Sequence, residues 1–529
     1  MSEPHATHDT LRELGRGAAL GLAGSVFAAG VAFALAIAVA RGLSPEEAGR
    51  FFTATSLFAL LVAATCFGTE AGLARFLLRL EAAGEHGSVR RAIGWAAGPT
   101  IGAACVVSVL LLASAERMGS LLGLGPDGPR VVVCLAVALP TAVAAEVLLG
   151  STRGFGHILP TVVADRIVRA GLQGVLALTI VAAGGGLVVV TAGWVGAYVV
   201  SAALALVWAA RVVHRRGPRA GVELVGSGAP EPALGRRFWS FTWPRGVGAL
   251  AQMGIQKSDI VIIALLLTPV DAALYAVATR FVPLGQMAVQ ALQQVLQPRL
   301  TGLLVGGDPA ALATVFRTAT SWSILLAWPI YLVVLCAPST YLGVFGGSYA
   351  SAAPVVVLLA SAMLVAVATG PVDTLLLMSG RSRLSMTNAL VALGIDLVLC
   401  VLLVPRWGIA GAAVAWAIAV LVRCGLATFQ VRRQFALAPD RHALRTALLP
   451  VACFGVPVLA SSPLGLDLGG LLVTVVAGGS VYLVVLAHLR VPLALDLVVP
   501  HRRSVAATHV IHPAEESDSS CALDTPCVR

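Results

Sequence analysis

The chain has 529 residues, of which 58% are hydrophobic and only 12% are charged, and it carries a formal net charge of +10. About a quarter of the residues in soluble domains are charged, so this composition excludes a soluble domain and indicates an integral membrane protein. The arginines fall between apolar runs and form no patch with interleaved aromatic residues, which excludes a nucleic acid as partner.

The first predicted element is a transmembrane helix over 17–40, which follows a cytoplasmic N-terminal tail, residues 1–16. The end of this helix, "AIAVARG", superficially resembles the small-residue cleavage site of a secretory signal. Its apolar run is longer than the roughly 7–15 residues of a signal-peptide core. We therefore expect the helix to be retained.

Apolar runs of similar length recur along the chain, divided by short polar breaks. A helix needs about 20 apolar residues to cross the hydrocarbon core, where every backbone amide must be bonded within the protein. The sequence predicts an all-α polytopic membrane protein with about fourteen transmembrane helices. They are expected at 17–40, 51–78, 92–115, 131–150, 160–183, 187–210, 239–267, 271–298, 314–337, 351–378, 385–404, 408–430, 446–462 and 468–488.

Arginine is distributed unevenly between the two sides that these spans define. If the N-terminus is inside, most arginines of the breaks face the cytoplasm. This asymmetry is the one that the positive-inside rule describes. We therefore expect a multi-pass protein of the plasma membrane, the bacterial inner membrane, with both termini in the cytoplasm. The opposite breaks hold only Arg41, Arg50, Arg117, Arg130 and Arg406.

The longest internal break, 211–238, is rich in glycine, proline and arginine, and it is predicted to be a cytoplasmic linker between six helices and eight. The first six helices form an N-lobe, 17–210, and helices seven to twelve form a C-lobe, 239–430. Two further helices lie within 446–488. The tail 489–529 has no aromatic residue and is predicted to be disordered in the cytoplasm.

The two lobes begin with similar sequences, because "ARGLSPEEAGRFFTAT" at 40–55 aligns with "ALLLTPVDAALYAVAT" at 264–279. Chance similarity between apolar helices is the alternative. The matched proline, serine/threonine and acidic positions favour a parallel six-helix repeat. Transporters place their substrate site between such repeats.

The seventh span carries a stripe of polar side chains. Its residues Arg245, Gln252, Gln256 and Asp259 are spaced by seven, four and three, which places them on one helix face. Lys257, the only lysine in the chain, lies roughly 200° around the helix from Asp259, so these two cannot pair. An ionisable group near the bilayer centre costs at least about 2.5–3.5 kcal/mol, so this stripe is a functional-site hypothesis.

The eighth span carries a second stripe, with Arg280 about a third of a turn away from it. Each glutamine alone is equally well explained by hydrogen bonding between helices. Four in register beside a lysine and an aspartate favour the lining of a hydrated, substrate-binding cavity at mid-bilayer. The stripe consists of Gln286, Gln290, Gln293 and Gln297.

The first lobe contributes Glu70 and Arg75 of the second span, for which a cavity role and a structural role stay equally open. Asp165 and Arg169 are spaced by four, and we expect an ion pair at the surface or the cytoplasmic rim.

Two further acidic residues lie in the C-lobe, Asp373 and Asp396. Each is a candidate partner for Lys257 or a candidate site for a coupling ion or proton, and the sequence does not choose between these roles.

No set of residues has the spacing of a catalytic or metal site. The cysteines of the apolar runs form no close-spaced pairs, and the histidines lie mostly in tails and breaks. The chain has no glycine-rich loop of the kind that holds the phosphates of ATP. We therefore expect no enzymatic activity, no metal and no cofactor.

Four stretches carry a family resemblance: "ARGLSPEEAGRFF", "KSDIVIIALLLTPVDAALYAVATRFV", "QPRL" and "LLLMSGRSRLSMTNALVALGIDLVLCVLLVPRWGIAGAAVAWAIA". The chain resembles the polysaccharide (O-antigen type) flippases of the multidrug/oligosaccharidyl-lipid/polysaccharide exporter superfamily. The resemblance covers most of residues 15–435. Each stretch is moderately specific, and their order and spacing are more so.

The resemblance implies a flippase that moves a polyprenyl-pyrophosphate-linked oligosaccharide to the outer leaflet, by alternating access of two lobes, for cell-surface polysaccharide synthesis. Arg245, Lys257 and Arg280 would then attract the pyrophosphate, and the glutamines would bond to sugar hydroxyls. The expected partners are the lipid-linked oligosaccharide, membrane lipids, and glycosyltransferases or a polymerase of the same pathway.

Three alternatives stay open. Lipid-II flippases are similar in architecture but have arginines in the first helix, whereas 17–40 has no charge. Multidrug antiporters of the same superfamily resemble twelve-helix proteins with an acidic residue in that helix, which is also absent here. A membrane scaffold for glycosyltransferases, without transport, is the alternative of another class.

Overall fold

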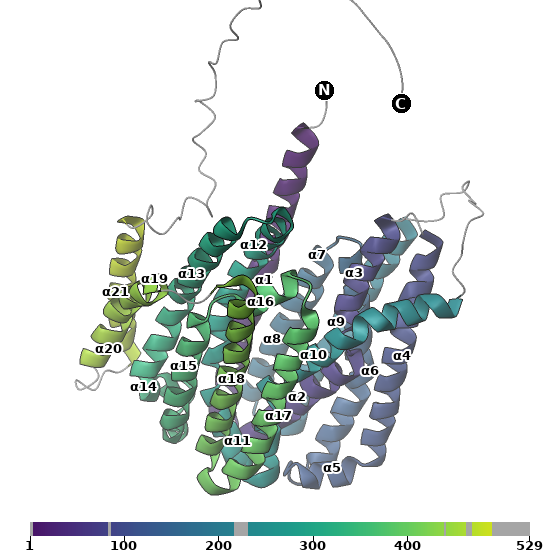
Figure 1. The fold of residues 1–529 in the computed structure, drawn as a ribbon. Coiled ribbons are helices and arrows are strands. Elements are labelled where there is room, and N and C mark those ends of the chain that lie inside the picture. Colours follow the sequence, from purple (N-terminus) through teal and green to yellow (C-terminus); the bar gives the residue numbers. More distant parts are fainter. Residues whose placement is uncertain (1–3, 83–85, 216–230, 438–440, 462–467, 489–529) are drawn as a thin grey trace, which may run out of the picture. The chain divides into compact units, whose positions relative to one another are not determined.

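Helices form the regular structure of the part of the chain that the structure describes (Figure 1). Twelve helical spans in this part are long and apolar enough to cross a membrane, and Arg445–Ala460 is a shorter apolar helix. The prediction of an all-α polytopic membrane protein is confirmed. The structure, a computed structural model, describes residues 4–82, 86–215, 231–437, 441–461 and 468–488.

The helices of the first half include one broken span. The predicted span 51–78 consists of two helices separated at Phe67 and Gly68, which both have positive φ, 42° and 72°. The elements are α1 (Pro4–Gly42), α2 (Pro45–Cys66), α3 (Thr69–Ala82), α4 (His86–Ala113), α5 (Ala115–Leu121), α6 (Gly128–Gly154), α7 (Leu159–Thr161), the π-helical turn η1 (Val162–Arg169), α8 (Ala170–Ala182) and α9 (Leu187–Arg215).

The second half also contains broken spans, with breaks within the predicted spans 271–298 and 351–378. The elements are α10 (Glu231–Leu266), α11 (Pro269–Ala278), α12 (Phe281–Gly306), α13 (Pro309–Cys336), α14 (Pro338–Gly343), the 3₁₀ turn η2 (Gly347–Ala352), α15 (Ala353–Ala368), α16 (Val372–Met378), α17 (Ser382–Trp407), α18 (Ile409–Phe435), α19 (Arg441–Pro450), the π-helical turn η3 (Val451–Gly455), α20 (Val456–Ser461) and α21 (Leu468–His488).

All fourteen predicted spans fall on helical segments, but two of them are not among the twelve long apolar spans. The span 160–183 is α7, η1 and α8, and its middle carries Asp165, Arg166 and Arg169. The span 446–462 is short and also contains a π-helical turn. These two account for the difference between the predicted count of about fourteen and the twelve long apolar spans.

Helices occupy both described ends of the predicted linker 211–238. Helix α9 continues to Arg215 and α10 begins at Glu231, while 216–230 lies outside the described residues. Hydropathy marks where a helix leaves the apolar layer, and it does not mark where the backbone hydrogen bonds end. The arginine-rich end of α9 and the start of α10 therefore fall within the predicted linker.

Of the two predicted tails, the structure describes only the N-terminal one. Helix α1 begins at Pro4, so most of the predicted N-terminal tail 1–16 is helical and continuous with the first span. The predicted disordered tail 489–529 lies outside the described residues.

The aligned sequences of the two halves form the same local structure. Ser44 Oγ accepts a hydrogen bond from the Glu47 amide, and the Glu47 carboxylate accepts one from the Ser44 amide. Thr268 and Asp271 form the same reciprocal pair at the start of α11. This capping box bonds two of the amides that a helix start leaves unpaired, and a proline follows each cap.

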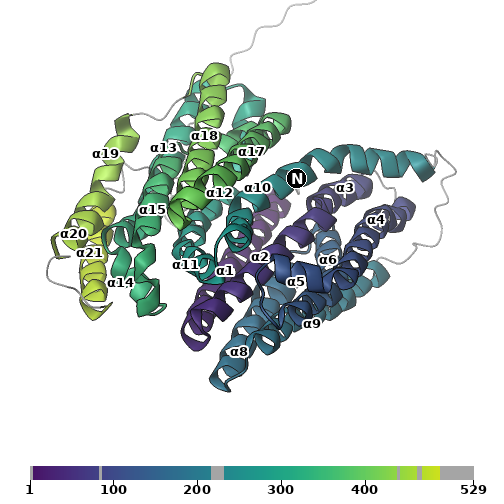
Figure 2. The same ribbon diagram turned by 90° about the horizontal axis from the view of Figure 1, so that it is seen from below.

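Helices of the two halves meet with very little space between their backbones. A Cβ atom added at Gly49 of α2 would lie 1.7 Å from the carbonyl oxygen of Pro269, which begins α11. A Cβ added at Gly68 would lie 2.6 Å from the Cα of Gly246 in α10. Small residues allow such close approach between helices in membranes. Figure 2 shows α10 passing from α3 and α4 to α17, all of which it contacts.

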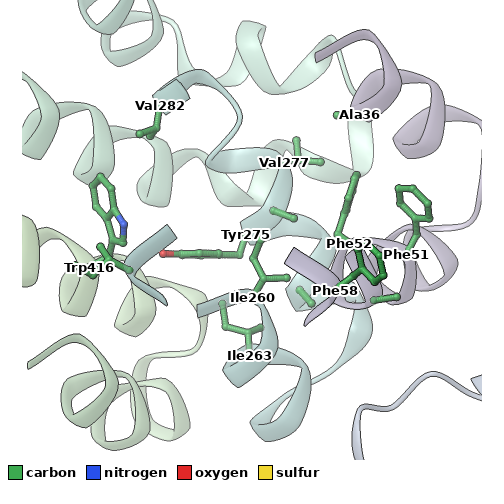
Figure 3. Close-up of a cluster of buried hydrophobic side chains, with 14 of the residues drawn as sticks. Ala36, Phe51, Phe52, Phe58, Ile260, Ile263, Tyr275, Val277, Val282 and Trp416 are labelled. Carbon is green, nitrogen blue, oxygen red and sulfur yellow. The ribbon is translucent and has the colours of Figure 1, made fainter. Parts of the chain in front are cut away.

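A hydrophobic core extends across these contacts. Tyr275 of α11 lies between α10 and α18, with its hydroxyl directed to the side of Trp416 and away from Phe52 and Phe58 (Figure 3). This core belongs to the unit Met1–Tyr482, which contains both predicted lobes. The second unit, Leu483–Arg529, is described only at the end of α21.

Candidate functional site

Two buried aspartates from different helices lie together in the second half. Asp259 of α10 is 3% exposed and Asp396 of α17 is 0% exposed. Tyr275 Oη donates a 2.6 Å hydrogen bond to Asp259 Oδ2, and the Cys400 thiol donates to Asp259 Oδ1 over 3.4 Å. One oxygen of each carboxylate and the thiol sulfur all lie within 4.8 Å of one another.

The helix geometry explains this acidic cluster. Asp396 and Cys400 are spaced by four, so they share the face of α17 that packs on α10. Neither oxygen of Asp396 receives a hydrogen bond from the described residues, and the carboxyl group lies within bonding distance of Asp259 if one of the two holds a proton. Two adjacent carboxylates in a dry site cannot both be charged without a cation. The acidic cluster can therefore hold a proton or a cation.

Two cations within the spans lack an acidic partner among the described residues. Lys257 of α10 is half-buried, and its ammonium lies close enough to Arg280 for mutual repulsion. The Arg280 guanidinium carbon lies 4.8 Å from the centroid of the Phe52 ring, and its buried Nε has no hydrogen-bond partner in the described part. Lys257 and Arg280 form what we call the cation pair.

Neither Asp373 nor Asp396 is the partner of Lys257, although the sequence left that role open. Asp373 lies 3.9 Å from Arg423 of α18, measured from Oδ2 to Nε. The same arginine donates a hydrogen bond to the side-chain oxygen of Gln252. Sequence reasoning overlooked Arg423, although an arginine inside the span 408–430 is itself a signal.

The side-chain amides of the α12 glutamines make no hydrogen bond with any described residue. Gln290 is exposed, and Gln286, Gln293 and Gln297 are half-buried. Gln256 of α10 is also exposed. Their amides do not join helices in this conformation, and they can bond to water or to a ligand.

Two ion pairs of the first half involve residues that the sequence singled out. Arg153 of α6 donates to Glu70 over 2.6 Å, and Arg169 donates to Asp165 over 2.5 Å. The expected pair of Asp165 and Arg169 is present, but it is not at the surface, because the side chains are only 12% and 19% exposed. Arg169 also donates to Gln173, within the bundle.

Glu146 of α6 interacts electrostatically with the carboxylates and the arginines of both ion pairs. Sequence reasoning missed it. The available signal was a single acidic residue in the span 131–150, which has no other charge.

Three arginines surround the ring of Phe241. The guanidinium carbons of Arg75, Arg79 and Arg245 lie 5.2, 5.8 and 4.6 Å from the ring centroid. Arg75 and Arg79 come from α3, and Phe241 and Arg245 come from α10. The structure thus brings the predicted Arg75 and Arg245 together, and it places them apart from the acidic cluster and the cation pair.

Residues 14–304, more than half of the chain, match the model of a family described as polysaccharide biosynthesis protein. A comparison with curated protein sequences gave no match.

Several solved structures share the fold. The lipid II flippase MurJ in an inward closed conformation aligns with a TM-score of 0.68 at 11% identity, over 90% of this chain and 99% of that one. An inward-facing multidrug resistance MATE family transporter of the MOP superfamily aligns with a TM-score of 0.59 at 15% identity, over 77% and 94%. The Vibrio cholerae MATE transporter VcmN in the bent form gives 0.54 at 14%, over 83% and 99%. At these identities the similarity shows a common fold.

Proposed function

The chain belongs to the polysaccharide biosynthesis protein family, and from this premise we propose that it is a flippase for a lipid-linked oligosaccharide. The cargo is an oligosaccharide on a polyprenyl diphosphate, which moves from the cytoplasmic to the outer leaflet of the plasma membrane by alternating access. Both termini face the cytoplasm in this proposal, as the arginine asymmetry indicates.

The observation that carries the proposal is the cation pair. Two positive charges within membrane spans and without an acidic partner among the described residues are costly, and mutual repulsion adds to the cost. An anionic headgroup that passes through the protein would neutralise both. Lysine is a compact point charge and suits a phosphate that must bind and then leave.

The unbonded glutamines support the same cargo. The amides of α12 and of Gln256 offer both donors and acceptors, which is the chemistry that sugar hydroxyls require. The side chains are flexible and make no hydrogen bond with the described residues, so they can adapt to several sugars.

The acidic cluster offers a binding site for the ion whose gradient would drive transport. We assign the binding of a coupling proton or monovalent cation to Asp259 and Asp396, since the pair is buried and Asp396 receives no hydrogen bond from the described part of the chain. Asp373, the other candidate, has a structural role in this proposal because it faces Arg423.

A transport assay separates this function from the alternatives. The purified chain is placed in liposomes that contain a fluorescent lipid-linked oligosaccharide, and the outward movement of the label is measured with an impermeant quencher. We expect movement faster than in protein-free liposomes. A rate equal to the protein-free rate would favour the scaffold. Faster movement of lipid II, or of an organic cation, would favour the corresponding member of the superfamily.

Lys257→Ala tests the cation pair in the same assay. We expect a fall in rate of about tenfold or more, because a hydrogen bond to a charged group contributes about 1.5–3 kcal/mol. Folding and membrane insertion should not change, since the ammonium has no partner among the described residues. Lys257→Arg, which keeps the charge, should retain more activity. A normal rate in Lys257→Ala would contradict the proposal.

A further inference from the structure

The three arginines around Phe241 have the geometry of a binding site. Arg75 and Arg79 are spaced by four on α3, and Phe241 and Arg245 are spaced by four on α10, so each pair shares one helix face. The two faces meet at the ring, with all three guanidinium carbons within 4.6–5.8 Å of its centroid. We call these residues the arginine cluster.

The arginine cluster lacks a counterion among the described residues. Each guanidinium lies beside an apolar ring, and Arg245 is repelled by the other two. Glu70, the acidic residue of α3, is already paired with Arg153. Arg75 and Arg79 are exposed and Arg245 is half-buried, so a ligand can reach their donors. Three converging guanidinium groups match an anion with several charges and oxygen acceptors.

The helix crossing beneath the arginine cluster holds the two faces in place. A Cβ added at Gly72 of α3 would lie 2.3 Å from the Thr242 hydroxyl oxygen, and Gly68 meets the backbone of Gly246. The two helix faces that carry the arginines are therefore held together by close contacts between α3 and α10, and a ligand need not bring the two helices together.

The arginine cluster is distinct from the cation pair. Arg245 and Lys257 are separated by twelve residues of α10, which is about 18 Å along a helix. One diphosphate cannot contact both at the same time. The chain therefore offers phosphates two positions along α10.

We propose that Arg75, Arg79 and Arg245 form a second binding site, which takes the diphosphate headgroup of a lipid. The assignment of this lipid to the cargo rests on the proposed function. The headgroup binds here before it reaches Lys257 and Arg280. Guanidinium groups suit this step, because they bond to phosphate oxygens through paired donors.

Binding to the purified full-length chain tests this site separately from transport. The probes are polyprenyl diphosphate and phosphatidylglycerol, added to the chain in detergent and measured by native mass spectrometry. We expect polyprenyl diphosphate to bind more tightly, and each of Arg75→Gln, Arg79→Gln and Arg245→Gln to weaken its binding by about tenfold. Arg299→Gln, which removes an exposed arginine from α12, is the matched control and should bind as the wild type does.

The outcomes separate the two proposals. Unchanged binding in all three variants would overturn the site. Equal, arginine-dependent binding of phosphatidylglycerol would overturn its assignment to the cargo. Arginine-dependent binding of polyprenyl diphosphate without transport in liposomes would support the site and contradict the proposed function. Circular dichroism and the variant Arg245→Lys, which keeps the charge and should bind with intermediate affinity, exclude loss of the fold as the cause.

Discussion

At the scale of single residues, the charged side chains within the spans divide by whether they have a partner. Glu70 with Arg153, and Asp165 with Arg169, are ion pairs between or within helices. Lys257, Arg280 and Asp396 have no ion-pair partner among the described residues, and Arg280 Nε and both carboxylate oxygens of Asp396 also lack a hydrogen bond there. An ion pair stabilises one particular packing of the helices. A charge in the membrane without a partner lowers stability, and its presence is explained if it binds a ligand.

Asp396→Asn removes one carboxylate of the acidic cluster and leaves a group that can donate to Asp259. We expect transport to lose its dependence on an imposed ion gradient, because the remaining carboxylate no longer needs a proton or cation. Thermal stability should not fall, since a repulsive charge is removed. The measurement is the rate in proteoliposomes with and without a proton or sodium gradient.

Asp373→Asn is the control for this prediction. It leaves Arg423 without its carboxylate, and we expect a loss of stability of about 1 kcal/mol with the gradient dependence intact. Gradient-dependent transport by Asp396→Asn would contradict the coupling role of the acidic cluster.

At the scale of helices, close backbone contacts determine which elements of the two halves touch. The capping box at Ser44 begins α2 and the one at Thr268 begins α11, and these helices pack directly on each other. Gly49 permits this approach, because the carbonyl of Pro269 occupies the place of a side chain.

Gly49→Ala should disrupt the contact between α2 and α11. The new methyl group would lie 1.7 Å from a backbone oxygen, so one of the helices must shift, and we expect a loss of stability of about 1–3 kcal/mol. The measurement is thermal unfolding in detergent. Gly394→Ala in α17 is the matched control, because no atom outside its own helix backbone lies within 4 Å of the added carbon. Equal melting temperatures for the two variants would refute this role of Gly49.

Hydropathy predicted the spans because it reports only the average environment of about 20 residues. It could not predict the breaks at Phe67 and at Arg280, since apolar residues continue on both sides of each. The candidate site was predicted from charges within spans, which found Lys257 and Asp396. Their surroundings depend on tertiary packing, so the pairing of Asp259 with Asp396 could not be deduced from helical spacing on α10 alone.

At the scale of the whole molecule, α1 is joined to the segment between α14 and η2 by hydrogen bonds at one end of the bundle. Arg41 donates to the carbonyl oxygens of Val344 and Gly343 over 2.8 and 3.2 Å, and Tyr349 Oη donates to that of Ala40 over 3.4 Å. A shallow, open groove of about 500 Å³ lies beside these contacts. In the proposed function these contacts lie on the outer side, and alternating access would break them.

Arg41→Gln should favour opening on that side. We expect Ala40→Cys, at a buried position beside the groove, to react about tenfold faster with a membrane-impermeant maleimide when Arg41→Gln is also present, because hydrogen bonds from a charged donor are lost. The exposed Cys105 is first replaced by serine. Arg406→Gln is the control, since among the described residues that side chain bonds only to Leu402 of its own helix. Equal labelling in both variants would show that Arg41 does not hold this end closed.

The contact between Gly68 and Gly246 has a mechanical consequence. Because two backbones touch there without side chains between them, this contact would be the fixed point of any tilt of α10 during the proposed transport. Arg245 is next to Gly246 and would hardly move in such a tilt. Lys257, about 16 Å along the helix from Gly246, would move further. Such a tilt would leave Arg245 in place to bind arriving phosphates, while Lys257 would move from one side of the membrane towards the other.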